Sequence, residues 1–147
     1  MFEKINPKKS LGQNFLKNQI TINLISDIIN IKESDYVIEI GPGMGAISSS
    51  ILDKTKNYVG IEKDPYLSEY LKKKYEKDIK IINEDVLKVE FSDIYKKKYR
   101  IIGNIPYNIS TEIIIKCIEN RMNIQSAFFM MQKEFVDRIQ SKFGNKV

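Results

Sequence analysis

The chain has 147 residues, of which 42% are apolar and 29% charged, a composition typical of one globular domain. It has no histidine and one cysteine, Cys117, which excludes histidine-based triads and an internal disulfide and argues against a metal site. No apolar run approaches the ~18–20 residues of a membrane span, and the amino terminus lacks the apolar core of a signal peptide. We therefore expect a cytoplasmic protein with no membrane contact and no metal. Its net charge of +5 permits a nucleic-acid partner without establishing one.

The first half of the chain predicts an arm followed by alternating helices and strands. Residues 1–17 show no sustained period, and Lys8-Lys9 is their best candidate for phosphate contact. Residues 19–31 predict an amphipathic helix, since the apolar positions recur at helical spacing. Those positions are Ile20, Leu24, Ile25, Ile28 and Ile29. Strands are expected over 36–40 and 58–62, with a helix over about 46–54, and Asp64-Pro65 should cap and open the next helix.

The second half continues the same alternation. Strands are expected over 79–83, 100–104 and 127–131, and helices over 110–120 and 133–143, the last with Phe135, Val136 and Ile139 inward. Five short apolar strands that alternate with helices predict an α/β fold with a doubly wound, mostly parallel sheet. In such sheets, ligands bind beyond the carboxyl ends of the strands.

Four residues of chemical interest fall at those strand ends: Gly41, Glu62, Asp85 and Asn104. The glycine loop that contains Gly41, Gly43 and Gly45 lets a ligand approach the backbone closely. At the second strand end, Glu62 can accept hydrogen bonds from two ribose hydroxyls, and Asp85 is placed to receive an adenine amino group. Together these features predict an adenosine-containing cofactor.

Two cofactors fit that pattern. Gly41, Gly43 and Ala46 match the dinucleotide pattern G-x-G-x-x-G/A. However, hydride transfer would need a further substrate domain, and Glu39 would place negative charge near a pyrophosphate. That charge suits the sulfonium and amino groups of S-adenosylmethionine better, so we favour S-adenosylmethionine as cofactor.

The turn after the fourth strand carries Asn104, Pro106 and Tyr107, which suit alkylation of the exocyclic amine of a base. The Asn104 side-chain oxygen can accept a hydrogen bond from such an amine. Pro106 stiffens the turn and leaves carbonyls free to point at the same amine. Tyr107 offers a flat face on which a flipped base can stack.

Four segments resemble the family of small-subunit (16S-type) rRNA adenine N6-dimethyltransferases. They are KSLGQNFL at 9–16, EIGPGMG at 39–45, NIPYNIST at 104–111 and QKE at 132–134. The resemblance implies a Rossmann-like class I S-adenosylmethionine methyltransferase. Such an enzyme would dimethylate two adjacent adenines in the 3′-terminal hairpin of small-subunit rRNA, within an immature small ribosomal subunit.

Residue roles also follow from the resemblance. Asn14 and Leu16 would close the cofactor pocket from the arm, and Gly41 would hold the methionine side. Glu62 would hold the ribose and Asp85 the adenine. Asn104 would contact both the cofactor and the target amine, and Tyr107 would stack on the flipped adenine.

The resemblance also bears on the extent of the domain. Family members continue with further strands and a helical carboxyl-terminal domain, whereas this sequence ends at Val147. We therefore expect residues 1–147 to form an S-adenosylmethionine-binding domain that is truncated after the fifth strand and its helix, without the helical RNA-binding domain. The alternatives are a large-subunit rRNA adenine methylase of the erythromycin-resistance type and a non-catalytic ribosome-assembly or transcription factor.

Overall fold

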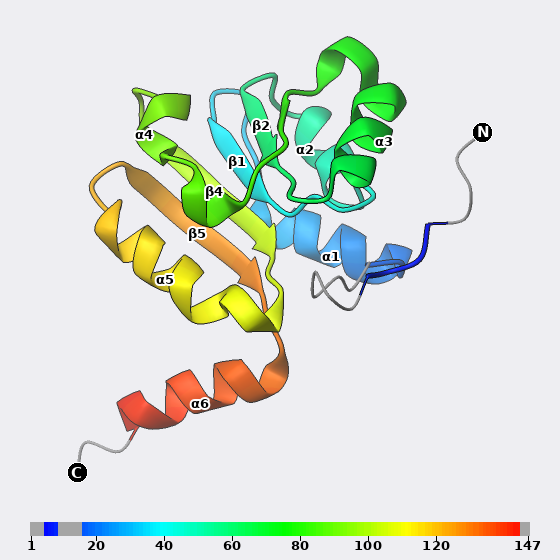
Figure 1. Ribbon diagram of the computed structural model, residues 1–147. Coiled ribbons are helices and arrows are strands. Elements are labelled where there is room, and N and C mark those ends of the chain that lie inside the picture. Colours follow the sequence, from blue (N-terminus) through cyan, green and yellow to red (C-terminus); the bar gives the residue numbers. More distant parts are fainter. Residues whose placement is uncertain (1–4, 9–15, 145–147) are drawn as a thin grey trace.

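A computed structural model describes residues 5–8 and 16–144 and places five strands in one sheet (Figure 1). The spatial order is β3-β2-β1-β4-β5, and every neighbouring pair is parallel. The strands are β1 (Val37–Ile40), β2 (Tyr58–Ile61), β3 (Ile81–Ile82), β4 (Tyr99–Asn104) and β5 (Ile124–Met130). The predicted parallel α/β sheet is thus confirmed.

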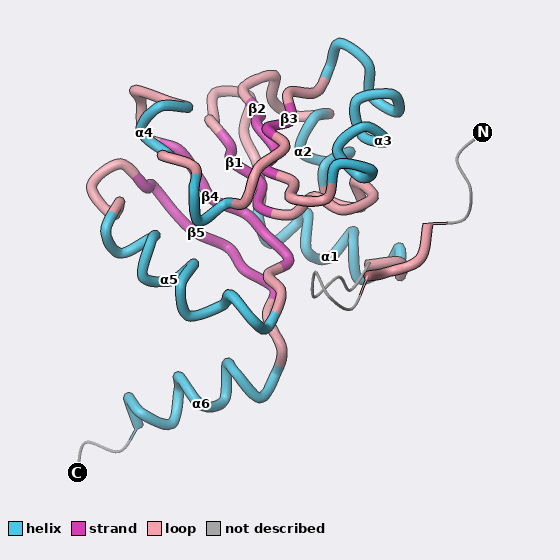
Figure 2. The backbone as a smooth tube through the Cα atoms, viewed as in Figure 1, coloured by secondary structure: helices cyan, strands magenta, loops and turns pink. Residues whose placement is uncertain are grey.

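Six α-helices connect or flank these strands within the described ranges (Figure 2). They are α1 (Gln19–Ile29), α2 (Ser48–Leu52), α3 (Pro65–Tyr75), α4 (Phe91–Ile94), α5 (Ser110–Glu119) and α6 (Lys133–Gly144). Three single 3-10 turns are η2 (Glu76–Asp78), η3 (Val86–Lys88) and η4 (Tyr107–Ile109). None of the helices in this part of the chain combines the length and apolarity that a bilayer span requires.

The sheet is doubly wound because its two faces carry different helices. One apolar cluster joins α1, α2 and α3 to one face, through residues such as Ile25, Ile51 and Leu71. The second joins η3, α4 and α5 to the other face, through residues such as Phe91 and Ile113. All four residues of β1 and of β2 are buried, as expected of parallel strands covered on both sides.

Helix α1 confirms the expected burial of Ile25 and Ile29 but not that of Ile20, Leu24 and Ile28. Ile22, Ile25 and Ile29 are buried. By contrast, Ile20 is 80% exposed, Leu24 58% and Ile28 60%. The helix also ends earlier than predicted, because Asn30 adopts a left-handed conformation (φ 50°) and its N–H caps the Ser26 carbonyl. Two apolar stripes compete on this helix, and only packing against the sheet selects between them.

Several other boundaries differ from those predicted. The third strand has two residues instead of five, and β5 begins at Ile124 rather than at Ala127. Helix α2 begins at Ser48 rather than near Ala46 because positive-φ glycines still form a turn there. Helix α4 and the 3-10 turns were not predicted, because they are too short to show a helical period.

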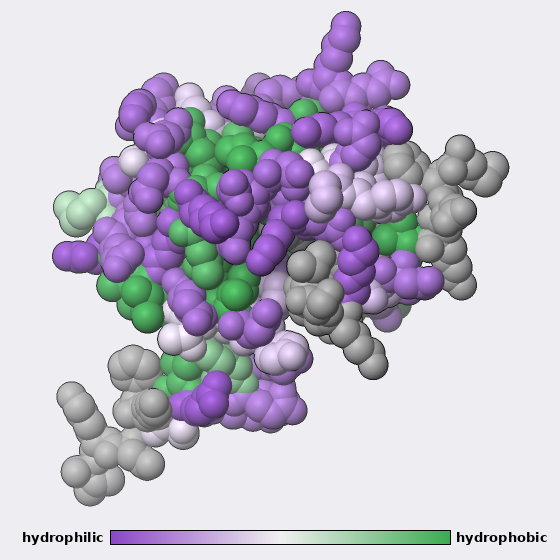
Figure 3. Space-filling model, viewed as in Figure 1, coloured by the Kyte–Doolittle hydropathy of each residue, from purple (hydrophilic) through white to green (hydrophobic). Residues whose placement is uncertain are grey.

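The side of the molecule that carries β5 and α5 also has exposed apolar side chains. Strand β5 lies at a sheet edge and pairs with β4. On α5, Ile115 is 50% exposed and Ile118 57%. Figure 3 shows apolar side chains over α5 and on the side of α6 turned towards it. The predicted inward residues of α6 are only half-buried, because this helix extends beyond β5 and does not cover the sheet (Figure 1).

Adjacent residues of α1 test which of its faces packs. Ile25→Ala should lower the free energy of unfolding by ~2–4 kcal/mol, because it leaves a cavity in the apolar cluster. Leu24→Ala should change it by less than about 1 kcal/mol, because that side chain is mostly in water. Urea unfolding of both variants measures the difference. A larger loss for Leu24→Ala would mean that the buried face is misassigned.

Candidate active site at the carboxyl ends of the strands

A cavity of about 250 Å³ opens at the carboxyl end of the sheet, and the segments that follow all five strands contribute to its lining. Of the residues expected at the site, nine line it. They are Leu16, Glu39, Gly41, Gly43, Glu62, Asp85, Asn104, Pro106 and Tyr107. The expected Asn14 lies outside the described residues. The expected residues therefore lie around one continuous cavity, at the edge of the sheet where parallel α/β proteins bind ligands.

The glycine loop takes a backbone course that other residues rarely adopt. Gly41 and Gly43 have φ of +63° and +62°, and both border the cavity. The Gly41 N–H donates to the Ile61 carbonyl (2.9 Å), which holds the loop against the end of β2. Gly45 (φ +84°) instead faces α3, where an added Cβ would lie 2.7 Å from the Tyr75 hydroxyl oxygen. We therefore assign Gly45 to the turn and not to the cavity wall.

Glu62 connects this loop to the next helix. One carboxylate oxygen accepts from the Gly43 N–H (3.1 Å) and the other from the Asp64 N–H (2.9 Å). Glu62 is 6% exposed, and burial raises its pKa although both backbone bonds oppose the rise. Each oxygen keeps a lone pair for a further donor. The side chain therefore both fixes the loop and remains able to bind hydroxyl groups.

Glu39 is a second buried acid beside the cavity. It is 3% exposed and accepts, at one oxygen, from the Ser48 hydroxyl (2.6 Å) and the Tyr58 hydroxyl (2.5 Å). Burial raises its pKa to about 7, and the nearby charge of Glu62 adds to the rise, while the two hydroxyl donors lower it. A carboxyl of this kind suits a cationic ligand group.

The Asp85 carboxylate already has two hydrogen-bond partners within the chain. Its side chain caps η3 by accepting from the Leu87 N–H (3.0 Å), and its other oxygen accepts from the Lys63 ammonium (3.1 Å). Burial alone would raise the pKa of Asp85, but these two hydrogen bonds and the positive charges of Lys63 and Lys88 together lower it. An amino group that binds Asp85 must share the carboxylate with Lys63 or displace it.

The turn after β4 is rigid and partly open. Asn104 ends the strand, and the Ile105 N–H donates to the Met130 carbonyl (2.9 Å). The Pro106 carbonyl accepts from Ser110 Oγ (3.0 Å) and the Ile109 N–H (3.3 Å). That carbonyl thus already accepts two hydrogen bonds inside the turn. Tyr107 is 61% exposed, as a stacking platform requires.

The amino-terminal arm reaches the same region. Leu16 lines the cavity and packs against the α1–α3 cluster. Lys8, which the sequence suggested for phosphate contact, forms a 2.9 Å ion pair with the buried Asp64. Asp64 also caps α3 through the Tyr66 N–H, as its position before Pro65 predicted. The arm is therefore tied to the start of α3, close to Glu62.

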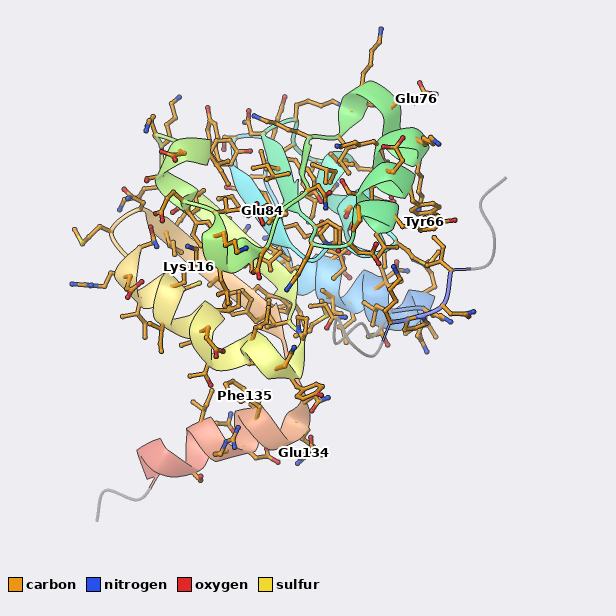
Figure 4. The ribbon with its side chains drawn as sticks, in the orientation of Figure 1. Tyr66, Glu76, Glu84, Lys116, Glu134 and Phe135 are labelled. Atoms are coloured by element: carbon orange, nitrogen blue, oxygen red, sulfur yellow. The ribbon has the colours of Figure 1, made fainter. Side chains whose placement is uncertain are left out.

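Sequence reasoning missed part of the cavity wall. Met130, Met131 and Gln132 line it from the end of β5, beside the turn after β4. Applied to the fifth strand, the strand-end rule would have found them. Glu84, labelled in Figure 4, contributes from the loop after β3. Across the described residues, no three His, Cys, Asp or Glu side chains gather as a metal site would require.

A doubly wound parallel sheet, a glycine loop after β1 and an acidic residue after β2 define a nucleotide-cofactor-binding α/β protein. Comparison with known proteins gives the family. Residues 4–147 match the model described as ribosomal RNA adenine dimethylase. The chain belongs to this family, which confirms the resemblance seen in the sequence motifs.

Individual relatives agree with that family. The chain is 44% identical over 144 residues to ribosomal RNA small subunit methyltransferase A of Malacoplasma penetrans, covering 97% of this chain and 52% of that protein. The protein of the same name from Pelagibacter ubique is 47% identical over 149 residues, with 96% and 55% covered. The chain thus spans about half the length of these relatives.

Solved structures match the fold. A dimethyladenosine transferase from Plasmodium falciparum has a TM-score of 0.77 and 31% identity, covering 86% of this chain and 46% of that one. The 23S rRNA methyltransferase ErmE has a TM-score of 0.78 and 28% identity, with 89% and 53% covered. The Rossmann-like methyltransferase fold expected from the sequence is confirmed.

The buried Glu39 predicts a pH dependence of stability. Its pKa in the folded chain is about 7 against an ordinary 4.5, so the folded state holds this proton more tightly than the unfolded state. The resulting stabilisation is present below the ordinary value and is lost as pH rises through about 7. Glu39→Gln should remove this loss, which is on the order of 3 kcal/mol between acid and mildly alkaline pH.

Urea unfolding of both proteins at several pH values measures this effect. Glu69→Gln, at a position 59% exposed on α3, controls for the loss of a charge. Equal pH slopes for the unmodified chain and Glu39→Gln would contradict a raised pKa at Glu39.

Proposed function

We propose that this cavity binds S-adenosylmethionine. The observation that carries the proposal is that Gly41, Glu62 and Asn104, far apart in the sequence, meet at one cavity. The residues fit the cofactor: the glycine backbone borders the space without side chains, Glu62 can receive ribose hydroxyls, and Glu39 suits a cationic methionine end. A dinucleotide would bring its pyrophosphate near Glu39, which argues against it. Leu16 and Asp85 would complete the pocket, Asp85 at the adenine.

We propose further that the turn after β4 holds the target adenine. The cofactor supplies an electrophilic methyl group when bound. Asn104 Oδ1 and the Ile105 carbonyl would accept the two N6 hydrogens, and this favours a pyramidal, nucleophilic nitrogen. Pro106 keeps the two acceptors in place, and Tyr107 would stack on the base. The nitrogen lone pair would bond to the methyl carbon while the bond from that carbon to sulfur breaks and leaves its electron pair on the sulfur. N6 would then lose a proton to solvent.

The proposed substrate is small-subunit rRNA within an immature subunit, dimethylated at N6 of two adjacent adenines near its 3′ end. The names of the Malacoplasma and Pelagibacter relatives support this choice. A cytoplasmic location belongs to the same proposal. The likeness to ErmE supports a second candidate, methylation of large-subunit rRNA.

We also propose that residues 1–147 supply cofactor binding and chemistry, and that specific rRNA binding needs further protein surface. This is supported by the greater length of the relatives and by the exposed apolar side chains around β5 and α5. The chain alone should therefore bind cofactor but bind rRNA with little sequence preference.

Two substitutions in the turn separate chemistry from base capture. Asn104→Ala should abolish methyl transfer while cofactor binding persists through Glu39 and Glu62. Tyr107→Ala should weaken capture of the target adenine by ~1–3 kcal/mol, because it removes the stacking face. Tyr107→Phe, which keeps the ring, should have a much smaller effect. Tyr66→Ala is the matched control, because Tyr66 lies on α3 and is also partly exposed (Figure 4).

Steady-state methylation kinetics measure these effects. Equal losses for Tyr107→Ala and Tyr107→Phe would assign the role to the hydroxyl and refute stacking.

Transfer of a labelled methyl group identifies the substrate. The protein at its natural length is incubated with labelled S-adenosylmethionine and either immature small subunits or large-subunit rRNA. We expect dimethyladenosine in small-subunit rRNA and none with Asn104→Ala. Label in large-subunit rRNA would favour the second candidate. Cofactor binding without transfer to either would favour a non-catalytic assembly factor.

A further inference from the structure

The carboxyl of Glu39 is held in one orientation from one side only. Glu39 lies in the middle of the sheet, with Gly60 of β2 and Ile102 of β4 as its register neighbours. Ser48 of α2 and Tyr58 of β2 both donate to the same oxygen, Oε2. Since Glu39 also lines the cavity, the carboxyl has a protein side that is satisfied and a cavity side.

The charged groups near Glu39 do not compensate a negative charge on its carboxyl. Within residues 5–8 and 16–144, none of the ion pairs includes Glu39. From β2, the titratable neighbours are Tyr58 and, just beyond the strand, Glu62, whose negative charge opposes ionisation. From α3, Tyr75 contributes an electrostatic interaction that raises the pKa of Tyr58. The pairing position on β4, Ile102, is apolar, and Lys63 at the cavity pairs with Asp85.

Burial makes the ionised form of a carboxyl unfavourable, because the charge loses its hydration. A cation placed beside the carboxyl makes the ionised form favourable again. We propose that Glu39 is a largely neutral acid in the free site below neutral pH and that it ionises when the cationic methionine end of the cofactor binds, releasing a proton. This inference rests on the proposed cofactor. Glu39 would thereby select ligands by charge, favouring S-adenosylmethionine over neutral nucleosides of the same shape.

Tyr58 and Ser48 are positioning residues for this step. Both donate to Oε2, so both favour the ionised form. Burial, together with the charge of Glu39, raises the pKa of Tyr58 well above its ordinary value, so its hydroxyl keeps its proton and stays a donor. The O–H bond of Glu39 breaks on ionisation, its electron pair stays on the carboxylate, and the proton goes to buffer.

Calorimetric titration in buffers of different ionisation enthalpy counts the protons released. With S-adenosylmethionine, about half a proton should be released at pH 7, because the pKa of Glu39 is about 7. Release should approach one proton at lower pH and vanish in alkaline buffer. 5′-Methylthioadenosine, which shares the nucleoside but has no cationic group, should release none. It also controls for Glu62, whose expected ribose contacts it would retain.

Two variants test whether the released proton comes from Glu39. Glu39→Gln should abolish the release. Tyr58→Phe should shift the pH midpoint of release upward by roughly one unit, because the carboxylate loses a donor. That shift remains measurable if Glu39→Gln fails to bind, and a purely structural role of Tyr58 would not produce it.

Three outcomes would overturn the inference. Binding of S-adenosylmethionine without proton exchange between pH 6 and 8 would refute it and leave the proposed function intact. Release that persists in Glu39→Gln, or an unchanged midpoint in Tyr58→Phe, would assign the proton elsewhere. Failure of the folded chain to bind S-adenosylmethionine at any pH would instead refute the proposed function itself.

Discussion

The carboxylate of Glu62 holds together the two loops on which the cavity depends. It accepts from Gly43 in the loop after β1 and from Asp64 at the start of α3. The parallel register of β1 and β2 makes this possible, because it brings both strand ends to one edge of the sheet. If this carboxylate were lost, the buried Asp64 N–H and the partly buried Gly43 N–H would lose their acceptor, and the glycine loop would lose its tie to α3.

The same register explains why acidic groups can be kept in the interior. Glu39 and Glu62 both reside near the carboxyl ends of central strands, and burial raises the pKa of both. Hydroxyl donors compensate Glu39, and backbone donors compensate Glu62. The remaining electrostatic cost is of the kind found at binding sites, where a ligand supplies the missing partner.

Much of this arrangement could be predicted from the sequence, because short apolar runs and glycine turns are local signals. They gave the five strands and placed Gly41, Glu62 and Asn104 at one edge. The predictions failed where packing decides between local alternatives. Helix α1 has two apolar stripes, and contact with the sheet selects the one with Ile25. Likewise, the engagement of Asp85 by Lys63 and the turn of Gly45 towards Tyr75 depend on segments distant in sequence.

A crystal structure of the chain with S-adenosylmethionine would show directly whether the cofactor occupies this cavity. We expect the nucleoside between Glu62 and Asp85, the methionine end beside Glu39, and the methyl group directed towards the turn at residues 104–107. A cofactor bound at any other surface, or a crystal in which the cavity keeps its shape but excludes the cofactor at saturating concentration, would contradict this expectation.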